Sequence, residues 1–232
     1  APLYCLKDAR GNFVTTPDKL DQILRETWSP VYKGNFENST DSIVDYFAKY
    51  LPFIRKAPEH KLAPITTEDL VALCSTISPS APGLDALHPQ DMRLLNSTCL
   101  YWIAALFNLI ESGRPWPSDL LHVGAHLLCK DQDNVTAALS YRILLITPTL
   151  YRVWARLRPA HLEPWVCQWT DASMFAGRKG AAADEGWYLT GIELEAAVAD
   201  NLKLVGGTMD LYKCFDQVCR PCLLYTSDAA DD

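Results

Sequence analysis

The sequence lacks any run of eighteen apolar residues, which is about the length that a membrane-spanning helix requires. Its first residues, APLYCLKDAR, also lack the basic and then apolar layout of a secretory signal. We therefore expect no membrane partner and an intracellular location, in the cytoplasm or the nucleus. The chain begins without methionine, so we expect its start to be the edge of a fragment.

An excess of positive charge is missing as well. The chain has 21 Lys and Arg against 28 Asp and Glu, which gives a formal net charge of -7. This balance argues against a general nucleic-acid coat protein, because such proteins neutralise phosphates with clustered basic side chains. The basic residues are nevertheless concentrated, since residues 120–180 hold seven of them against four acids. Residues 181–232 are acidic, so the two segments need separate explanations.

The sequence also lacks a convincing zinc motif. Cys219 and Cys222 have C-x-x-C spacing, but no second pair completes a tetrahedral set. The eight cysteines are scattered through apolar segments, which is typical of buried thiols rather than of a disulfide framework. His122 and His126 lie four residues apart in a stretch, LLHVGAHLLCK, that predicts extended chain, so we interpret them as facing solvent or the core.

What the sequence does contain is a mixture of helical and strand-like patterns, which predicts a helix-rich α+β fold. Thr66 and Asp69 form a capping-box pattern, and Thr16-Pro17 and Thr147-Pro148 each place a cap before a proline. The predicted elements are a hairpin over 3–14, helices over 17–30, 42–50, 70–75, 91–113, 181–199 and from 148 onward, a second hairpin of strands 120–129 and 141–146, and a strand over 203–211. The proline-containing segment 78–89 is predicted to be a loop.

Asp210 ends the predicted strand 203–211. An ionised carboxylate at the end of a buried strand costs several kcal/mol unless it is paired or bound to a cation. The alternative is a turn in which Asp210 caps the following helix.

Four segments resemble motifs of reverse transcriptases, most closely those of LINE-type (non-LTR) retrotransposons. MDLYKCFDQV is similar to the first palm motif and SAPGLDALHPQDMRLL to the fingers motif around P-G-x-D. LLCKDQDNVTAALSYRILLITPTLYRVWARLR resembles the next fingers motif, and FAGRKGAAADEGWYL the glycine-arginine stretch before the palm aspartate. The resemblance implies a right-hand polymerase with fingers and the start of the palm over 65–221, preceded by a lead-in segment over 1–64.

The resemblance implies roles for residues around the reaction centre. Two Mg²⁺ ions about 4 Å apart clamp the attacking and leaving oxygens in this chemistry. Asp210 would be the catalytic, metal-binding carboxylate, and the carbonyl of Leu211 would supply a second oxygen. Lys130 and Arg142 would close over the triphosphate, and Phe215 would stack beneath the nucleotide sugar.

The remaining implied contacts involve the template. Gly177 and Arg178 would touch the template backbone or order a loop, and both readings remain open. Asp216 is expected to order its turn rather than to bind metal. The implied partners are an RNA template, a DNA primer and deoxynucleoside triphosphates, and the sequence indicates no oligomeric state.

The sequence departs from the family pattern at Ser80, Ala86 and Ile143, where the family usually has lysine, glycine and proline. Group II intron and retron reverse transcriptases share the core motifs, so they remain alternatives. Further alternatives are a non-catalytic nucleic-acid-binding relative, a decayed retroelement and a helical interaction domain unrelated to polymerases.

The final residues, YTSDAADD, do not supply the second acidic motif of such a polymerase. Asp231 follows Asp210 too closely, and no β-forming residues surround it. Residues 222–232 back-translate to a DNA sequence that resembles a transposase adapter used in library preparation, so we interpret them as a sequencing artefact. With one carboxylate of the metal set, the fragment itself is predicted to be inactive.

Overall fold

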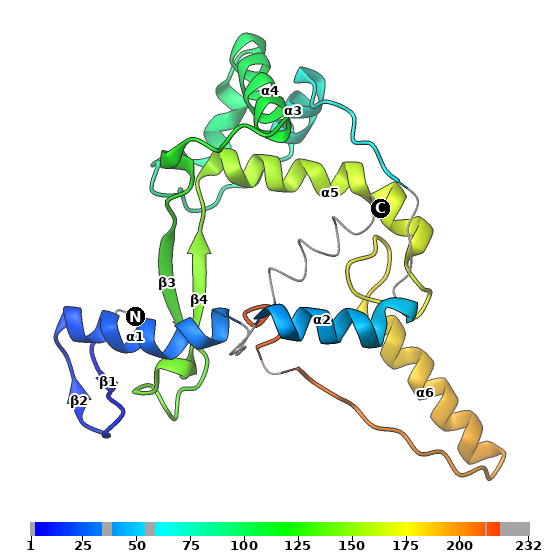
Figure 1. Ribbon diagram of the computed structural model, residues 1–232. Coiled ribbons are helices and arrows are strands. Elements are labelled where there is room, and N and C mark those ends of the chain that lie inside the picture. The colour runs from blue at the N-terminus through cyan, green and yellow to red at the C-terminus, as the bar shows by residue number, and fades with distance from the viewer. Residues whose placement is uncertain (1–2, 34–38, 54–58, 212, 219–232) are drawn as a thin grey trace. The chain divides into compact units, whose positions relative to one another are not determined.

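The computed structural model describes residues 3–33, 39–53, 59–211 and 213–218. They form a helix-rich α+β structure with two small antiparallel sheets (Figure 1). Within these ranges, no helix combines the length and the apolar character needed to cross a membrane. The interpretation of 222–232 as an artefact, and the C-x-x-C pair, lie outside the described residues. The elements are β1 (Leu6–Lys7), β2 (Phe13–Val14), α1 (Pro17–Tyr32), α2 (Ser39–Tyr50), α3 (Thr67–Ser75), α4 (Ser97–Glu111), β3 (Gly124–Cys129), β4 (Tyr141–Ile146), α5 (Thr149–Trp169) and α6 (Ala183–Ala199).

The chain forms two compact units, residues 1–31 with 62–161 and residues 32–61 with 162–232. Each unit combines an N-terminal stretch with a later one. The boundaries at 64 and 221, which rest on the family resemblance, stay predictions.

The predicted N-terminal hairpin is confirmed. Leu6 pairs with Val14 in the antiparallel β1–β2 ribbon. The Asp8 carboxylate orders the turn by accepting the backbone N–H groups of Arg10 and Asn12 at 2.9 and 2.8 Å. Gly11 adopts a φ of 83°, a conformation that glycine reaches without steric cost.

Helix α1 begins at Pro17 as predicted, but it does not stop at Pro30. It continues to Tyr32, because a proline in the last turn removes only one hydrogen bond and leaves the earlier turns intact.

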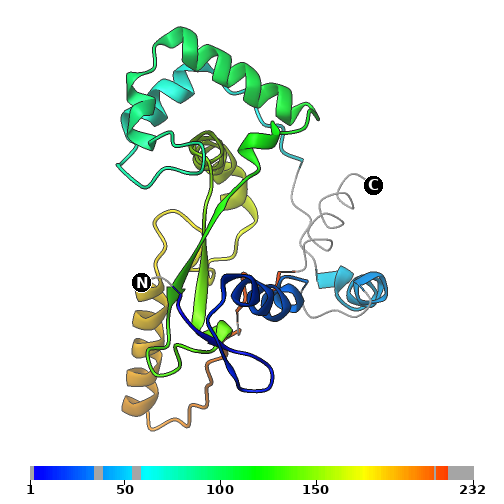
Figure 2. The same cartoon turned by 90° about the vertical axis from the view of Figure 1, so that its left-hand side faces the viewer.

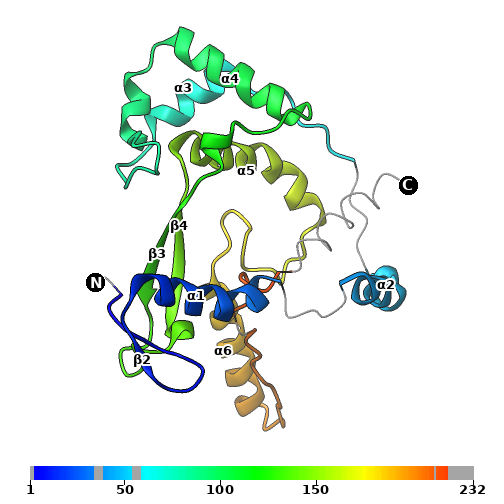
Figure 3. The same cartoon turned by 60° about the vertical axis from the view of Figure 1, so that its left-hand side comes forward.

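The N-terminal hairpin and α1 pack against the loop end of the β3–β4 hairpin (Figure 3). Leu6, Leu20, Ala138 and Tyr141 form this buried cluster. The backbone N–H of Lys7 donates to the carbonyl of Thr136 at 2.9 Å, which fixes β1 against the loop. The N-terminal hairpin and α1 therefore complete the core at the loop end of the second hairpin.

The predicted second hairpin is also confirmed, with Gly124 paired to Ile146 and Cys129 to Tyr141. Strand β3 begins at 124 rather than at 120, because residues 118–120 form a 3₁₀ turn. Two core-facing side chains, Leu127 and Cys129, are partly buried, whereas Leu128 between them is exposed.

A larger core joins α3, α4 and the first part of α5, which lie together in both views (Figures 1 and 2). Leu70, Met92 and Phe107 are fully buried in it. The capping box of α3 is confirmed, since Thr66 Oγ1 accepts the N–H of Asp69 at 3.1 Å and the Asp69 carboxylate accepts the N–H of Thr66 at 2.9 Å.

Helix α4 starts later than the predicted residue 91. The Asn96 side chain accepts the N–H of Cys99 at 2.9 Å and sets the helix start at Ser97. Residues 89–94 form a separate 3₁₀ helix that begins with Pro89. The apolar spacing continued across this break, so periodicity alone could not locate the cap.

The predicted strand over 203–211 is wrong. These residues follow α6 without helix or strand structure and are exposed. A strand requires a neighbour to satisfy its backbone groups, and the described residues provide none for this segment.

The expectation that the cysteines are buried holds only in part. Cys74 is buried, and burial raises the pKa of its thiol. Cys99, Cys167 and Cys214 are exposed. Cys99 and Cys167 lie on helices, where their apolar sequence neighbours point to other faces. Cys214 lies in an exposed turn.

Candidate functional site

Lys130 and Arg142 lie on one exposed face of the β3–β4 hairpin. The N–H of Lys130 donates to the carbonyl of Ser140 at 2.8 Å, so the ladder extends one pair beyond β3. Arg142 pairs with Leu128. Because side chains alternate along a strand, Lys130, Leu128 and Arg142 point to the same side. Diagonal neighbours of this kind lie about 7–8 Å apart. The structure thus brings together the two cations that the sequence predicts as phosphate ligands.

We define the hairpin face by the exposed side chains on this side. Its members are His126, Leu128, Lys130, Arg142 and Leu144.

The opposite side of the hairpin holds these strands in place. Tyr141 is buried, and its hydroxyl donates to the carbonyl of Val135 at 2.7 Å. Burial raises the pKa of Tyr141, and the nearby thiols of Cys129 and Cys5 raise it further. Arg142 therefore follows a residue anchored in the core, which fixes its backbone.

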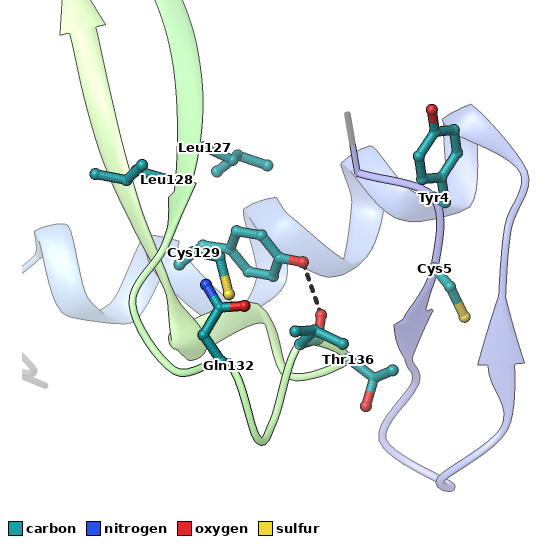
Figure 4. A pocket seen from close by; sticks show the side chains of 9 residues that line it. Tyr4, Cys5, Leu127, Leu128, Cys129, Gln132 and Thr136 are labelled. Atoms are coloured by element: carbon teal, nitrogen blue, oxygen red, sulfur yellow. Dashed lines mark hydrogen bonds between the residues drawn. The ribbon is translucent and has the colours of Figure 1, made fainter. Parts of the chain in front are cut away.

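An open cavity of about 400 Å³ lies beside this anchor, between the N-terminal hairpin and the β3–β4 loop (Figure 4). Figure 4 shows the Cys5 thiol directed away from Cys129. The lining of the cavity is mostly apolar and contains neither lysine nor arginine. It consists of Tyr4, Cys5, Leu127, Leu128, Cys129, Gln132, Val135, Thr136 and Tyr141. This composition does not suit a polyanion, so the hairpin face is the better candidate.

The P-G-L-D loop docks on the junction between β4 and α5. A Cβ added at Gly83 would lie 2.8 Å from Pro148 Cα and from the carbonyl oxygen of Thr147, so only glycine fits without movement. The Asp85 carboxylate accepts the N–H of Thr149 at 3.0 Å, at the start of α5. The glycine and the aspartate of this motif thus have local structural roles.

Arg152 and Thr149 hold the same loop from the helix side. The Arg152 guanidinium donates to the carbonyl of Ala81 at 2.9 Å, and the Thr149 hydroxyl donates to the carbonyl of Leu87 at 2.5 Å. The loop also reaches the hairpin, because Leu84 Cδ2 is 3.8 Å from the position of a Cβ at Gly124. Gly124 is two residues from His126, so Leu84 lies at the end of the hairpin face.

Asp210 and Leu211 are exposed, in the segment that follows α6. No group of three His, Cys, Asp or Glu residues that could hold a metal occurs in the described ranges. Asp210 fits Mg²⁺ as a hard oxygen donor, but it supplies one ligand of a larger set. It belongs to the second compact unit, whereas Lys130 and Arg142 belong to the first. A shared site for the three residues stays a prediction.

Phe215 lies in a turn over 213–217 and is 90% exposed, so it is not a core aromatic. The N–H of Asp216 donates to the carbonyl of Lys213 at 3.0 Å. Lys213 adopts a left-handed φ of 47°. Asp216 thus takes part in the turn through its backbone.

Arg178 orders its own loop. Its guanidinium donates to the carbonyl of Asp171 at 2.9 Å, and Gly177 adopts a φ of 76°. The Asp171 carboxylate in turn accepts the N–H of Ser173 at 3.0 Å. These contacts support the loop-ordering reading of Gly177 and Arg178, and contact with a template stays a prediction.

The sequence reasoning missed the structural setting of three residues. His126 shares the hairpin face, which the strand register reveals and which alternation along the strand could have indicated. Asp85 caps α5 from 64 residues away, and Arg158 is buried against Glu111. Neither long-range contact leaves a local sequence signal. Comparison of the chain with protein-family models and with curated proteins finds no match.

Proposed function

We propose that the chain is part of an RNA-directed DNA polymerase, a reverse transcriptase of a retrotransposon. The observation that carries this proposal is the exposed pair Lys130 and Arg142 on one face of an anchored hairpin. The resemblance of the four sequence motifs supports the same reading. The substrates would be an RNA template, a DNA primer and deoxynucleoside triphosphates.

The chemistry of the two cations suits a triphosphate. An arginine guanidinium presents a planar fork that binds phosphate oxygens bidentately, and a lysine ammonium supplies a compact charge. In the proposed enzyme Asp210 and the Leu211 carbonyl would contribute oxygen ligands to one of two Mg²⁺ ions. Phe215 would lie under the nucleotide sugar, and Gly177 and Arg178 would lie near the template.

Nucleotide binding tests the proposal directly. We expect Lys130→Ala and Arg142→Ala each to weaken the binding of a deoxynucleoside triphosphate about tenfold, which corresponds to about 1.4 kcal/mol. Isothermal titration calorimetry on the whole chain would measure this. Lys19→Ala and Arg114→Ala are matched controls, because both are exposed cations outside the hairpin face. Equal affinities for all four variants would overturn the proposal.

A non-catalytic nucleic-acid-binding relative, including a decayed retroelement, is the second candidate. It is favoured by the exposure of Asp210, which makes no contact with another carboxylate in the described residues. Under the first proposal, a group II intron or retron reverse transcriptase remains an alternative to the retrotransposon enzyme. Primer extension separates catalysis from binding, and we expect no extension from this chain. If the chain does extend a primer and Asp210→Ala abolishes that extension, the chain is itself catalytic.

A further inference from the structure

We infer that the open cavity of Figure 4, hereafter the loop cavity, is a binding site for a small, neutral aromatic molecule that carries an amide-like hydrogen-bonding group. Its lining residues come from the segments 4–5 and 127–141, which both belong to the first compact unit. Nucleotidyl transfer uses none of the side chains that form this cavity, so the inference goes beyond the proposed function and does not depend on it.

The loop cavity has the size of a ligand site. Its volume of about 400 Å³ falls within the range of roughly 300–1,000 Å³ that is usual for small-molecule pockets. An apolar cavity of about 150 Å³ holds benzene, so the loop cavity has room for a molecule with two fused rings. Because the cavity is open, such a molecule can enter it from solvent.

The polar groups on the floor of the loop cavity already have partners. The buried and partly buried side chains of the lining are Cys5, Leu127, Cys129, Thr136 and Tyr141. The Tyr141 hydroxyl donates to the carbonyl of Val135 at 2.7 Å. The Cys129 thiol donates to the carbonyl of Asp131 at 3.2 Å. A ligand that fills the floor therefore needs apolar surface rather than further hydrogen bonds.

The same side chains favour an aromatic, uncharged ligand. The rings of Tyr4 and Tyr141 line the cavity, and aromatic rings pair favourably in offset or edge-to-face arrangements. The thiols of Cys5 and Cys129 add polarisable sulfur atoms, which contact aromatic rings favourably. The lining as the structure describes it contains no charged side chain, so an ionised ligand would lose hydration without gaining a partner.

Exposed side chains form the rim of the loop cavity. Tyr4 is 72% exposed, Leu128 50% and Val135 43%, and exposed apolar groups around a concave surface indicate a contact site. Gln132 supplies an amide to this rim, and Figure 4 shows no hydrogen bond from it to the other lining residues. An amide side chain offers both a donor and an acceptor. Gln132 can therefore pair with an amide group of the ligand.

The experiment compares naphthamide with naphthoate, which carries a negative charge on the same ring system. Ligand-observed NMR on the whole chain near neutral pH would measure both affinities. Naphthamide should bind at least tenfold more tightly, because the lining offers a carboxylate no cation. Equal affinities for the two compounds, or no binding of naphthamide, would overturn the inference.

A substitution at the rim locates the binding. Val135→Trp places a large ring at the cavity and should weaken naphthamide binding at least tenfold. Val123→Trp is the matched control, because Val123 is a similarly exposed valine outside the lining, and it should bind as the wild type does. If Val135→Trp keeps the wild-type circular dichroism and the wild-type affinity, naphthamide binds elsewhere and the inference is wrong.

A second substitution tests the hydrogen bond at an exposed position. Gln132→Leu should weaken naphthamide binding severalfold and leave the binding of naphthalene, which has no amide, unchanged. Equal losses for the two compounds would contradict the role of Gln132. Should Val135→Trp fail to fold, the compound pair and Gln132→Leu still decide the question.

Discussion

At the scale of single residues, the ion pair between buried Arg158 and the more exposed Glu111 stabilises the first compact unit. Arg158 is 5% exposed, and its guanidinium makes two hydrogen bonds to the Glu111 carboxylate. It also donates to the carbonyl of Ala63 at 3.0 Å, and Trp154 donates to Glu111 at 2.8 Å. This pair joins α4, α5 and the segment before α3. Removing one partner leaves a buried charge without compensation, which costs more than the pair contributes.

We predict that Glu111→Gln lowers the free energy of unfolding by about 2 to 3 kcal/mol at neutral pH. Urea unfolding followed by circular dichroism would measure the loss. Glu68→Gln is the control, because Glu68 is an exposed acid on α3. An equal effect of the two substitutions would contradict the stabilising role of the pair.

The same variant should change the pH dependence of stability. Burial acts to raise the pKa of Glu111, but hydrogen bonds from Arg158 and Trp154 outweigh it, so the pKa lies below the ordinary value of 4.5. The folded state then binds fewer protons than the unfolded state near this pH. The stabilisation is present above pH 4.5 and is lost as the pH falls through the lower folded value. Glu111→Gln should therefore flatten the acid limb of the stability curve.

At the scale of elements, the docking of the P-G-L-D loop on the β4–α5 junction connects two distant parts of the sequence. Gly83 lies against Pro148, and Asp85 caps Thr149. The hairpin strand that carries Arg142 leads directly into this junction. The loop therefore supports the end of the hairpin face as well as the start of α5.

We predict that Gly83→Ala destabilises the first unit by about 1 to 3 kcal/mol, because its Cβ would meet backbone atoms rather than a flexible side chain. Thermal unfolding would measure the change. Gly124→Ala is the matched control, since its nearest contact would be an ordinary 3.5 Å to the His126 side chain. The docking argument fails if Gly83→Ala is tolerated as well as Gly124→Ala.

Local signals predicted most of these elements and some of the site. The cap at Thr66, the hairpin over 3–14 and the β-forming residues of 141–146 each act within a few residues, so the sequence revealed them. The start of α4 depended on the Asn96 cap within a continuous apolar pattern. The segment 203–211 has the composition of a strand, but its pairing depends on partners that its own sequence does not specify. Long-range contacts such as Asp85 with Thr149 had no local signal for the same reason.

At the scale of the whole molecule, the N-terminal hairpin belongs to the same compact unit as the proposed phosphate-binding hairpin. Leu6 is fully buried against the cluster that contains Tyr141. Trp28 of α1 donates to the carbonyl of Ala138 at 3.3 Å. The N-terminal hairpin and α1 thus stabilise the β3–β4 loop, at a distance in sequence of more than a hundred residues.

We predict that Leu6→Ala destabilises this unit by about 2 to 4 kcal/mol, because a fully buried leucine leaves a cavity when truncated. The loss should spread to the β3–β4 loop, so residues 130–140 should be cleaved faster in limited proteolysis and their amides should exchange faster. Phe13→Ala is the control, because this neighbouring side chain is 66% exposed. If Leu6→Ala loses stability while the loop keeps its wild-type protection, the N-terminal hairpin does not support the loop. Faster exchange in the loop together with weaker binding of a deoxynucleoside triphosphate would instead show that the N-terminal hairpin helps to hold Lys130 and Arg142 in place.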